Sequence, residues 1–380
     1  MYIASHDYSH AADRRSGQAA PRQVGGFKPL YERLLRETPG DAARGAAAEL
    51  VRRELSLAQA EPCDLPQAPE GLFAWMQAHT QSVHASYGTY LAQRAAGAPR
   101  HYFSNRAHAL YFLRTVAPTK LVDGAWLYGL VEHAHNPRFS DLVRTYVEEL
   151  GEGDPDGNHV LLYRSLLAAH GLEQIDDLAD EMYRQGALQL ALGWNAQDFL
   201  PEIIGFNLGY EQLPLHLLIT AYELNELGID PYYFTVHATV DNADTGHARR
   251  ACQAVLDTLP RMDDGGAFWA RVRAGSKLAD AGVGTGEAIA GFDMEREVLA
   301  VFARKAAAGS GAHSDYCRVA GRSINEWLST PQDLPAFLQA LQDNGWIRRG
   351  EPAPNSRFWG LLQGLQKRGQ VLRRGEPLVD

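Results

Sequence analysis

The sequence predicts an all-α protein, built around one bundle of about eight or more helices. Long stretches consist of strong helix formers, as in DAARGAAAELVRRELSLAQA at residues 41–60. Apolar residues recur at spacings of three and four in stretches such as residues 69–97, which is typical of helices that bury one face. No convincing succession of alternating apolar and polar residues, the mark of half-buried strands, occurs before residue 265.

The pattern changes along the chain and suggests three parts. Residues 1–25 are small and polar, and we expect a disordered tail there. Residues 26–265 carry the continuous helical pattern and form the predicted bundle. Residues 266–380 are interrupted by glycine-rich stretches such as AGVGTGEAIAGF, and we expect a C-terminal extension to which the sequence assigns no role.

Composition excludes several classes of protein. The chain has 380 residues, of which 45% are hydrophobic and 22% charged, as in ordinary soluble proteins. A net charge of −10 argues against a nucleic-acid partner. Cys63, Cys252 and Cys317 show no CxxC spacing, so neither a disulfide framework nor a zinc–thiolate site is expected. Without a long apolar run or a secretory signal, we expect a cytoplasmic protein that does not enter a membrane.

The stretch FTVHATVDNADTGHARRA concentrates polar chemistry in an otherwise ordinary helical segment. On a continuous helix, His237, Asp241 and Asp244 fall on one narrow stripe because residues step by about 100°. His247 falls off that stripe unless the helix is distorted, which Gly246 would permit. The stripe is either a set of metal ligands facing the core or an exposed polar face, and the stretch by itself does not decide between them.

Two further stretches of the sequence carry acidic residues and histidines that are candidate metal ligands. Glu149 stands at a predicted helix end, a glycine-rich turn follows, and His159 opens the next helix. The turn would bring His159 back toward Glu149, although a capped helix with exposed acids is the simpler interpretation. Glu211 lies in the apolar stretch GFNLGYEQLPLHLL, where an ionised carboxylate needs a cation, and His216 is a weaker candidate.

Taken together, these pieces resemble the heme-oxygenase-like diiron oxidase and oxygenase family. Its motifs are a Glu with a His about ten residues later, a Glu on a following core helix, and an H-x3-D-x2-H motif. Glu149 and His159 match the first pair, Glu211 in GYEQLP matches the middle carboxylate, and His237 and Asp241 match the start of the last motif. The resemblance covers roughly residues 70–260 and implies a heme-oxygenase-like helical bundle.

The chain departs from the family pattern at one position. Asp244 stands where the family has the final His, and a histidine appears instead at position 247. Either Asp244 is a ligand, or a distorted helix brings in His247. The family often has a further carboxylate on an earlier helix, for which Asp123 in LVDGAWLYG is a weaker candidate, a turn or capping acid being the alternative.

The resemblance implies an iron-dependent oxidoreductase with two iron ions (Fe²⁺/Fe³⁺) and dioxygen as co-substrate. Imidazole and carboxylate are also the ligands that such iron prefers. The implied reaction is N-oxygenation or oxidative carbon–carbon cleavage of a small amino-acid-like or fatty-acid-like substrate, in natural-product biosynthesis. An external electron donor and a homodimer are both left open.

Two alternatives from other classes remain at this point. The first is a metal-free enzyme of the same fold, either thiaminase-like, with Cys252 as the catalytic thiol, or an oxidase of the quinone-biosynthesis type. The second is a non-catalytic helical binding protein in which the polar stripe is only a solvated face. Metal binding separates both alternatives from the diiron hypothesis.

Overall fold

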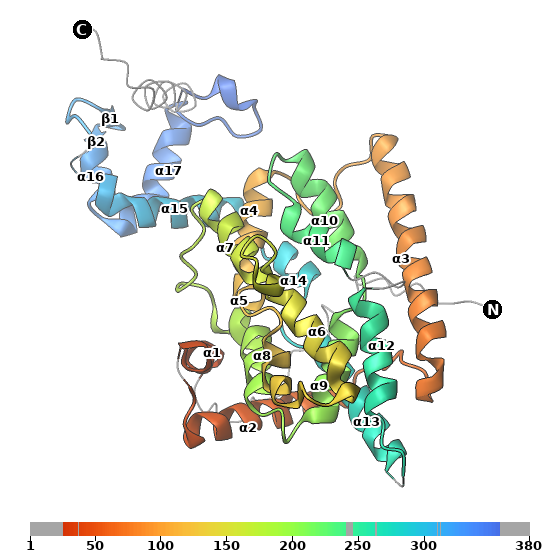
Figure 1. Cartoon of the computed structure of the whole chain (residues 1–380). Coiled ribbons are helices and arrows are strands. Elements are labelled where there is room, and N and C mark those ends of the chain that lie inside the picture. The colour runs from red at the N-terminus through yellow and green to blue at the C-terminus, as the bar shows by residue number, and fades with distance from the viewer. Residues whose placement is uncertain are drawn as a thin grey trace. The chain divides into compact units, whose positions relative to one another are not determined.

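The computed structural model describes residues 26–36, 38–240, 246–262, 264–309, 311 and 313–357 (Figure 1). The chain divides into two compact units, of which the first ends at Phe292 and the second begins at Asp293. The tail expected over residues 1–25 lies outside the described residues.

The first unit is built from helices, as the sequence predicts. Its α-helices are α1 (Phe27–Arg36), α2 (Asp41–Ala58), α3 (Leu72–Ala95), α4 (Arg106–Thr115), α5 (Ala117–Lys120), α6 (Ser140–Glu149), α7 (His159–Ala169), α8 (Arg184–Trp194), α9 (Leu200–Tyr210), α10 (Leu215–Glu226), α11 (Tyr232–Val240), α12 (His247–Thr258), α13 (Gly265–Ser276) and α14 (Thr285–Ala290). Its short 3₁₀ helices are η2 (Pro69–Gly71), η3 (Ala125–His133), η4 (Pro137–Phe139), η5 (Gly151–Gly153), η6 (Asp180–Tyr183) and η7 (Lys277–Asp280).

Two central helices, α8 and α9, organise the core of the first unit. Residues 185–193 of α8 and residues 201–208 of α9 are buried throughout, which is expected of a helix that is covered on every side. Helix α8 packs against α1, α2 and η3, while α9 packs against α12 and α13. Because α9 leads directly into Glu211, this packing fixes the position of one candidate ligand.

The first unit extends past residue 265, where the sequence suggested that the bundle would end. Helix α13 belongs to it because α13 and α9 approach each other through glycines. A methyl group on Gly205 would lie 1.9 Å from the Val272 carbonyl oxygen, and one on Gly275 would lie 2.1 Å from the Glu202 carbonyl oxygen. Gly205 and Gly275, which lie outside the glycine-rich stretches that suggested loops, therefore serve close helix packing.

The second unit is small and has a core of its own. It contains α15 (Met294–Gly309), an antiparallel hairpin of β1 (Arg318–Val319) and β2 (Arg322–Ser323), α16 (Ile324–Leu328), η8 (Pro331–Asp333), α17 (Leu334–Asp343) and η9 (Ala353–Asn355). Trp327 and Phe337 stack at the centre of this core, with ring centroids 5.5 Å apart. Among the described residues, no helix has both the length and the apolarity needed to cross a membrane.

The close contact between α9 and α13 makes a prediction about stability. Gly275→Ala should lower the free energy of unfolding by about 1–3 kcal/mol, because the added methyl group meets backbone that cannot move independently. Gly266→Ala is the matched control on the same helix, since a Cβ there meets nothing within 4 Å. Denaturant unfolding of both variants checks the prediction, and equal stabilities would contradict it.

Candidate metal centre

The end of α6 and the start of α7 bring two candidate residues together. Glu149 is the last residue of α6, and the chain then turns through η5. A bridge between Leu150 and Asn158 closes the turn, and the Asn158 side chain caps α7. His159, the first residue of α7, therefore faces α6, and its Nδ1 lies 2.6 Å from Glu149 Oε2.

Asp123 lies between α5 and η3 and contacts α11. Its Oδ2 lies 3.1 Å from Nε2 of His237 and accepts a 2.6 Å hydrogen bond from the Tyr233 hydroxyl. His237 Nδ1 lies 2.7 Å from the Tyr233 carbonyl oxygen, one turn earlier in α11. The His237 ring also lies against His159, with centroids 4.2 Å apart. Asp123, the weaker candidate from the sequence, therefore lies beside the stronger ones.

Gly124 allows this turn to approach Glu149. Its φ of +78° lies in the left-handed region, which favours glycine. A methyl group at this position would lie 2.9 Å from Glu149 Cβ, closer than side-chain carbons approach each other. The glycine therefore serves both the backbone conformation of the turn and the contact with Glu149.

Glu211 and His247 meet on the other side of Glu149. Glu211 follows the last residue of α9 and is buried. His247 Nδ1 lies 3.1 Å from Glu211 Oε2 and 3.4 Å from Glu149 Oε1. The other ring nitrogen, Nε2, lies 3.0 Å from Glu148 Oε2. His247 is thus held by carboxylates on both of its nitrogens.

The expectation of one continuous helix from His237 to His247 is wrong. Helix α12 begins at His247, after Gly246 with an extended backbone (φ −81°, ψ −168°). An extended residue of this kind starts a new helix, so the angular relation that placed His247 off the stripe does not apply. Asp241 and Asp244 lie outside the described residues.

Two groups of possible metal ligands result, and in each group the ligand atoms all lie within 4.8 Å of one another. Every side chain in both groups is buried, and Glu149 belongs to both. Within the described part of the chain, the first group is Asp123, Glu149, His159 and His237, and the second is Glu149, Glu211 and His247.

The protonation pattern of the first group fits a bound cation. Glu149 Oε2 and His159 Nδ1 are buried and adjacent, yet their geometry does not make a hydrogen bond. If His237 Nδ1–H donates to the Tyr233 carbonyl oxygen, a neutral His237 turns the lone pair of Nε2 toward Asp123. Buried lone pairs that face one another are unfavourable, and a metal ion between them removes that cost. Imidazole nitrogens with carboxylate oxygens suit iron.

Charged residues next to the second group keep Glu148 ionised, and Glu148 in turn contacts His247. Burial raises the pKa of Glu148, but hydrogen bonds from Arg250, Arg144 and His247 lower it to about 2. Glu148 therefore stays ionised and accepts a hydrogen bond from His247 Nε2. This leaves His247 Nδ1 directed at Glu211, the arrangement by which a carboxylate orients a metal-bound histidine.

Lys120 is the cation next to the first group. Burial raises the pKa of Asp123, but the charge of Lys120 and the contact with His237 hold it well below its usual range. Neither Lys120 nor Tyr233 was singled out by the sequence. Tyr233 could have been found, because it lies four residues before His237 on a helix and therefore on the same face. Lys120 belongs to no motif that would point to it.

The comparisons with known proteins agree with this geometry. A family model described as iron-containing redox enzyme matches residues 110–280. Residues 110–280 therefore belong with the iron-containing redox enzymes. This segment contains every member of both ligand groups. No curated protein and no solved structure matches the chain.

The match confirms three predictions. The family is the one that the motifs resemble, the protein is an iron-dependent oxidoreductase, and the fold is helical and heme-oxygenase-like. The buried His, Glu and Asp groups could bind metal.

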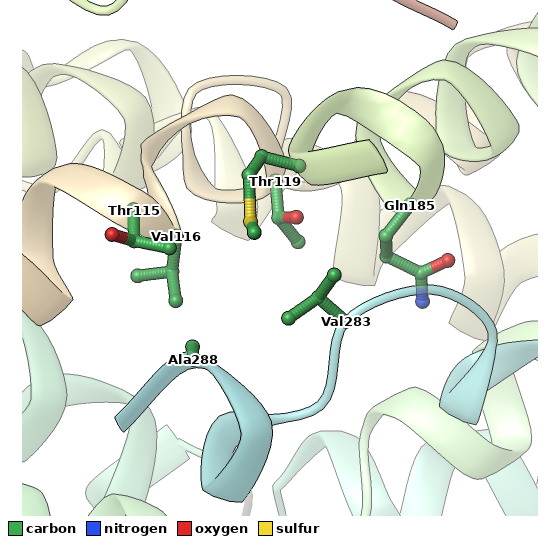
Figure 2. Close-up of a pocket in the computed structure, with 7 residues that line it drawn as sticks. Thr115, Val116, Thr119, Gln185, Val283 and Ala288 are labelled. Carbon is green, nitrogen blue, oxygen red and sulfur yellow. The ribbon is translucent and has the colours of Figure 1, made fainter. Parts of the chain in front are cut away.

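Cavities elsewhere do not compete with these groups as a site. A cavity of about 20 Å³ lies between α5, α8 and the start of α14, lined among others by Thr119, Gln185 and Val283 (Figure 2). It is too small for an organic substrate, since this volume holds about one water molecule. A larger pocket of about 360 Å³ is lined by Arg164 and its neighbours on α7 together with Leu121 and Glu173, and contains none of the grouped side chains.

Removing one carboxylate should separate metal binding from folding. Glu211→Gln keeps the shape and one acceptor but relieves the crowding of buried carboxylates, so the metal-free protein should unfold at nearly the same temperature. Added Fe²⁺ or Zn²⁺ should stabilise the wild-type protein by about 2–3 kcal/mol at a hundredfold excess over the dissociation constant, and the variant by much less.

Glu202→Gln is the matched control for this experiment. Glu202 is also a buried carboxylate of α9, but it pairs with Arg271 at 2.6 Å and belongs to neither ligand group. This variant should lose stability without metal and keep the full metal-dependent rise in melting temperature. If Glu211→Gln kept the full metal-dependent rise in melting temperature and Glu202→Gln lost it, Glu211 would not be a metal ligand.

Proposed function

We propose that this protein is a non-heme diiron oxidase or oxygenase that uses dioxygen to oxidise a small amino-acid-like or fatty-acid-like substrate. The observation that carries the proposal is the position of Glu149, whose two carboxylate oxygens reach both ligand groups. A carboxylate shared in this way would help to hold both ions of a metal pair and would partly neutralise their charge. A site for a single metal ion would not need a second group of ligands beside the first.

Each group would hold one iron ion through side chains from different helices. Asp123, His159 and His237 would hold the first, Glu211 and His247 the second, and Glu149 both. Iron bound there would supply the electrons that activate dioxygen for oxidation of the substrate. The proposed reaction is N-oxygenation or oxidative carbon–carbon cleavage in natural-product biosynthesis, with an external electron donor and a cytoplasmic location.

The surrounding residues orient the ligands and exclude water. The Tyr233 hydroxyl holds Asp123 in one orientation, and the Tyr233 carbonyl oxygen does the same for His237. Glu148 orients His247, and Arg250 keeps Glu148 charged. Because the ligands are buried, these contacts are not weakened by solvent and keep the ring nitrogens directed into the centre.

The metal-free and non-catalytic alternatives are both disfavoured. A thiaminase-like mechanism needs a reactive thiolate, but Cys252 is fully buried and burial raises its pKa to about 12. A purely structural role gives no reason for three carboxylates to converge in the core, since buried charges destabilise a fold unless they are compensated. The family match to iron-containing redox enzymes argues in the same direction.

Iron stoichiometry tests the proposal. The wild-type protein, purified without oxygen and incubated with Fe²⁺, should retain about two iron ions per chain after desalting. Glu149→Ala should lose both ions because it belongs to both groups, whereas His237→Ala should lose mainly one. His133→Ala is the control, since His133 stacks on Phe139 and lies in neither group. Two ions retained by Glu149→Ala would refute a shared carboxylate.

A second prediction concerns the last position of the family motif. His247→Ala should reduce iron content severely, because His247 Nδ1 lies among the second group, whereas Asp244→Ala should have a mild effect. Iron content and the visible absorption that appears on exposure to oxygen are both measured. A severe loss in Asp244→Ala alone would assign the position to the aspartate, and equally mild losses would mean that neither residue is a ligand.

A further inference from the structure

Tyr233 contacts two members of the first ligand group. Its hydroxyl donates the 2.6 Å hydrogen bond to Asp123 Oδ2, and its ring lies against that of His237, with centroids 4.4 Å apart. The side chain is buried, so bulk water does not reach it. A phenol gives up one electron readily when its proton leaves at the same time, and these contacts place Tyr233 to do so toward ions held by the first group.

The number of electrons that dioxygen consumes gives such a residue a task. Reduction of dioxygen to water takes up four electrons, and two ferrous ions that become ferric supply two of them. Bound substrate supplies the other two. When substrate is absent, these electrons come from an external donor or from the protein, and side chains that contact the ions are the first to be oxidised. A residue that gives an electron in a controlled way protects the ligands.

The acceptor of the phenolic proton distinguishes Tyr233 from Tyr163. A phenol that has lost an electron is a strong acid, so the electron leaves most easily where a base already accepts a hydrogen bond from the hydroxyl. Tyr233 donates to the carboxylate of Asp123. Tyr163, whose ring lies 4.6 Å from that of Tyr233, donates instead to the Leu113 carbonyl oxygen at 2.7 Å. A peptide carbonyl is a much weaker base than a carboxylate, so Tyr163 lacks this advantage.

Lys120 separates Tyr233 from Tyr210 in the same way. The Lys120 ammonium lies 5.3 and 5.9 Å from the ring centroids of Tyr210 and Tyr233, and it would repel a positive charge on either ring. Each ring therefore has to lose its proton together with the electron. In the described part of the chain, the Tyr210 hydroxyl accepts a 3.3 Å hydrogen bond from Lys120 and lies 3.3 Å from the Gln189 amide nitrogen. Neither an ammonium nor an amide takes up the proton.

We propose that Tyr233 is a redox-active residue, which gives one electron to the iron pair and its phenolic proton to Asp123 when dioxygen reacts before substrate has bound. The O–H bond of the phenol breaks, the side chain becomes a neutral tyrosyl radical, and the iron pair is reduced by one electron. The external donor of the proposed function supplies the fourth electron that dioxygen needs. A further electron from that donor, with the proton on Asp123, restores the phenol. The inference rests on the proposed function.

Electron paramagnetic resonance tests this assignment. The Fe²⁺-loaded protein without substrate is mixed with oxygenated buffer and frozen at a series of times. The wild-type protein should show a transient tyrosyl radical, whose signal narrows when the protein is produced with ring-deuterated tyrosine. Tyr233→Phe should lose the signal and keep its iron. Fluorotyrosine at position 233 alone keeps the hydroxyl and should change the hyperfine pattern, which decides the question if Tyr233→Phe does not fold.

Tyr90→Phe is the matched control. Tyr90 is also buried and donates its hydroxyl to a buried carboxylate, that of Glu223, at 2.9 Å, but Glu223 belongs to neither ligand group. Tyr90→Phe and Tyr163→Phe should both keep the radical. A signal that persists in Tyr233→Phe or disappears in Tyr90→Phe overturns the proposal. An unchanged hyperfine pattern with fluorotyrosine at position 233 overturns it as well.

Iron content is measured on the same samples and separates this inference from the proposed function. About two ions per chain together with a radical on Tyr233 supports both. The same iron content without any tyrosyl radical overturns the role of Tyr233 and leaves the diiron function standing. A wild-type protein that retains no iron overturns the proposed function, and the role of Tyr233 with it.

Discussion

The convergence of Glu149, Glu211 and Asp123 inside the bundle is the constraint on which the rest of the site depends. Each carboxylate loses hydration on burial, and together they repel one another. Glu149 is the last residue of α6 and Glu211 follows the last residue of α9, so both also lie at the negative end of a helix macrodipole. A fold that keeps this arrangement gives up stability, and metal binding is the compensation that we infer.

Four of the six grouped ligands, Glu149, His159, Glu211 and His247, lie at or next to helix ends. His159 and His247 are the first residues of α7 and α12, and each ring is directed by the turn that precedes it. A short turn can set the direction of a side chain at a helix end without changing how the rest of the helix packs. The neighbouring helices α8 and α9 are almost entirely buried, which gives these turns a rigid support.

Local patterns predict those parts of the site that depend on neighbouring residues. The Glu149–His159 pair is such a case, because the glycine-rich turn between them makes their approach possible, and the structure has the two side chains in contact instead of a capped helix with exposed acids. The helix from His237 onward was predicted too long, since a helical stripe takes no account of the new start after Gly246. Asp123 and Lys120 could not be ranked, because their roles depend on partners more than twenty residues away.

By itself, the sequence determines the helical class, through its helix formers and apolar spacing, and the residue types that make iron chemistry plausible. Tertiary structure alone decides which of those residues meet. Glu149 serves both ligand groups because α6 packs against α12 and turns back to α7, and Asp123 meets His237 from a segment 114 residues earlier in the chain. Distances between helices follow from packing of the whole bundle, and no short stretch of sequence contains that information.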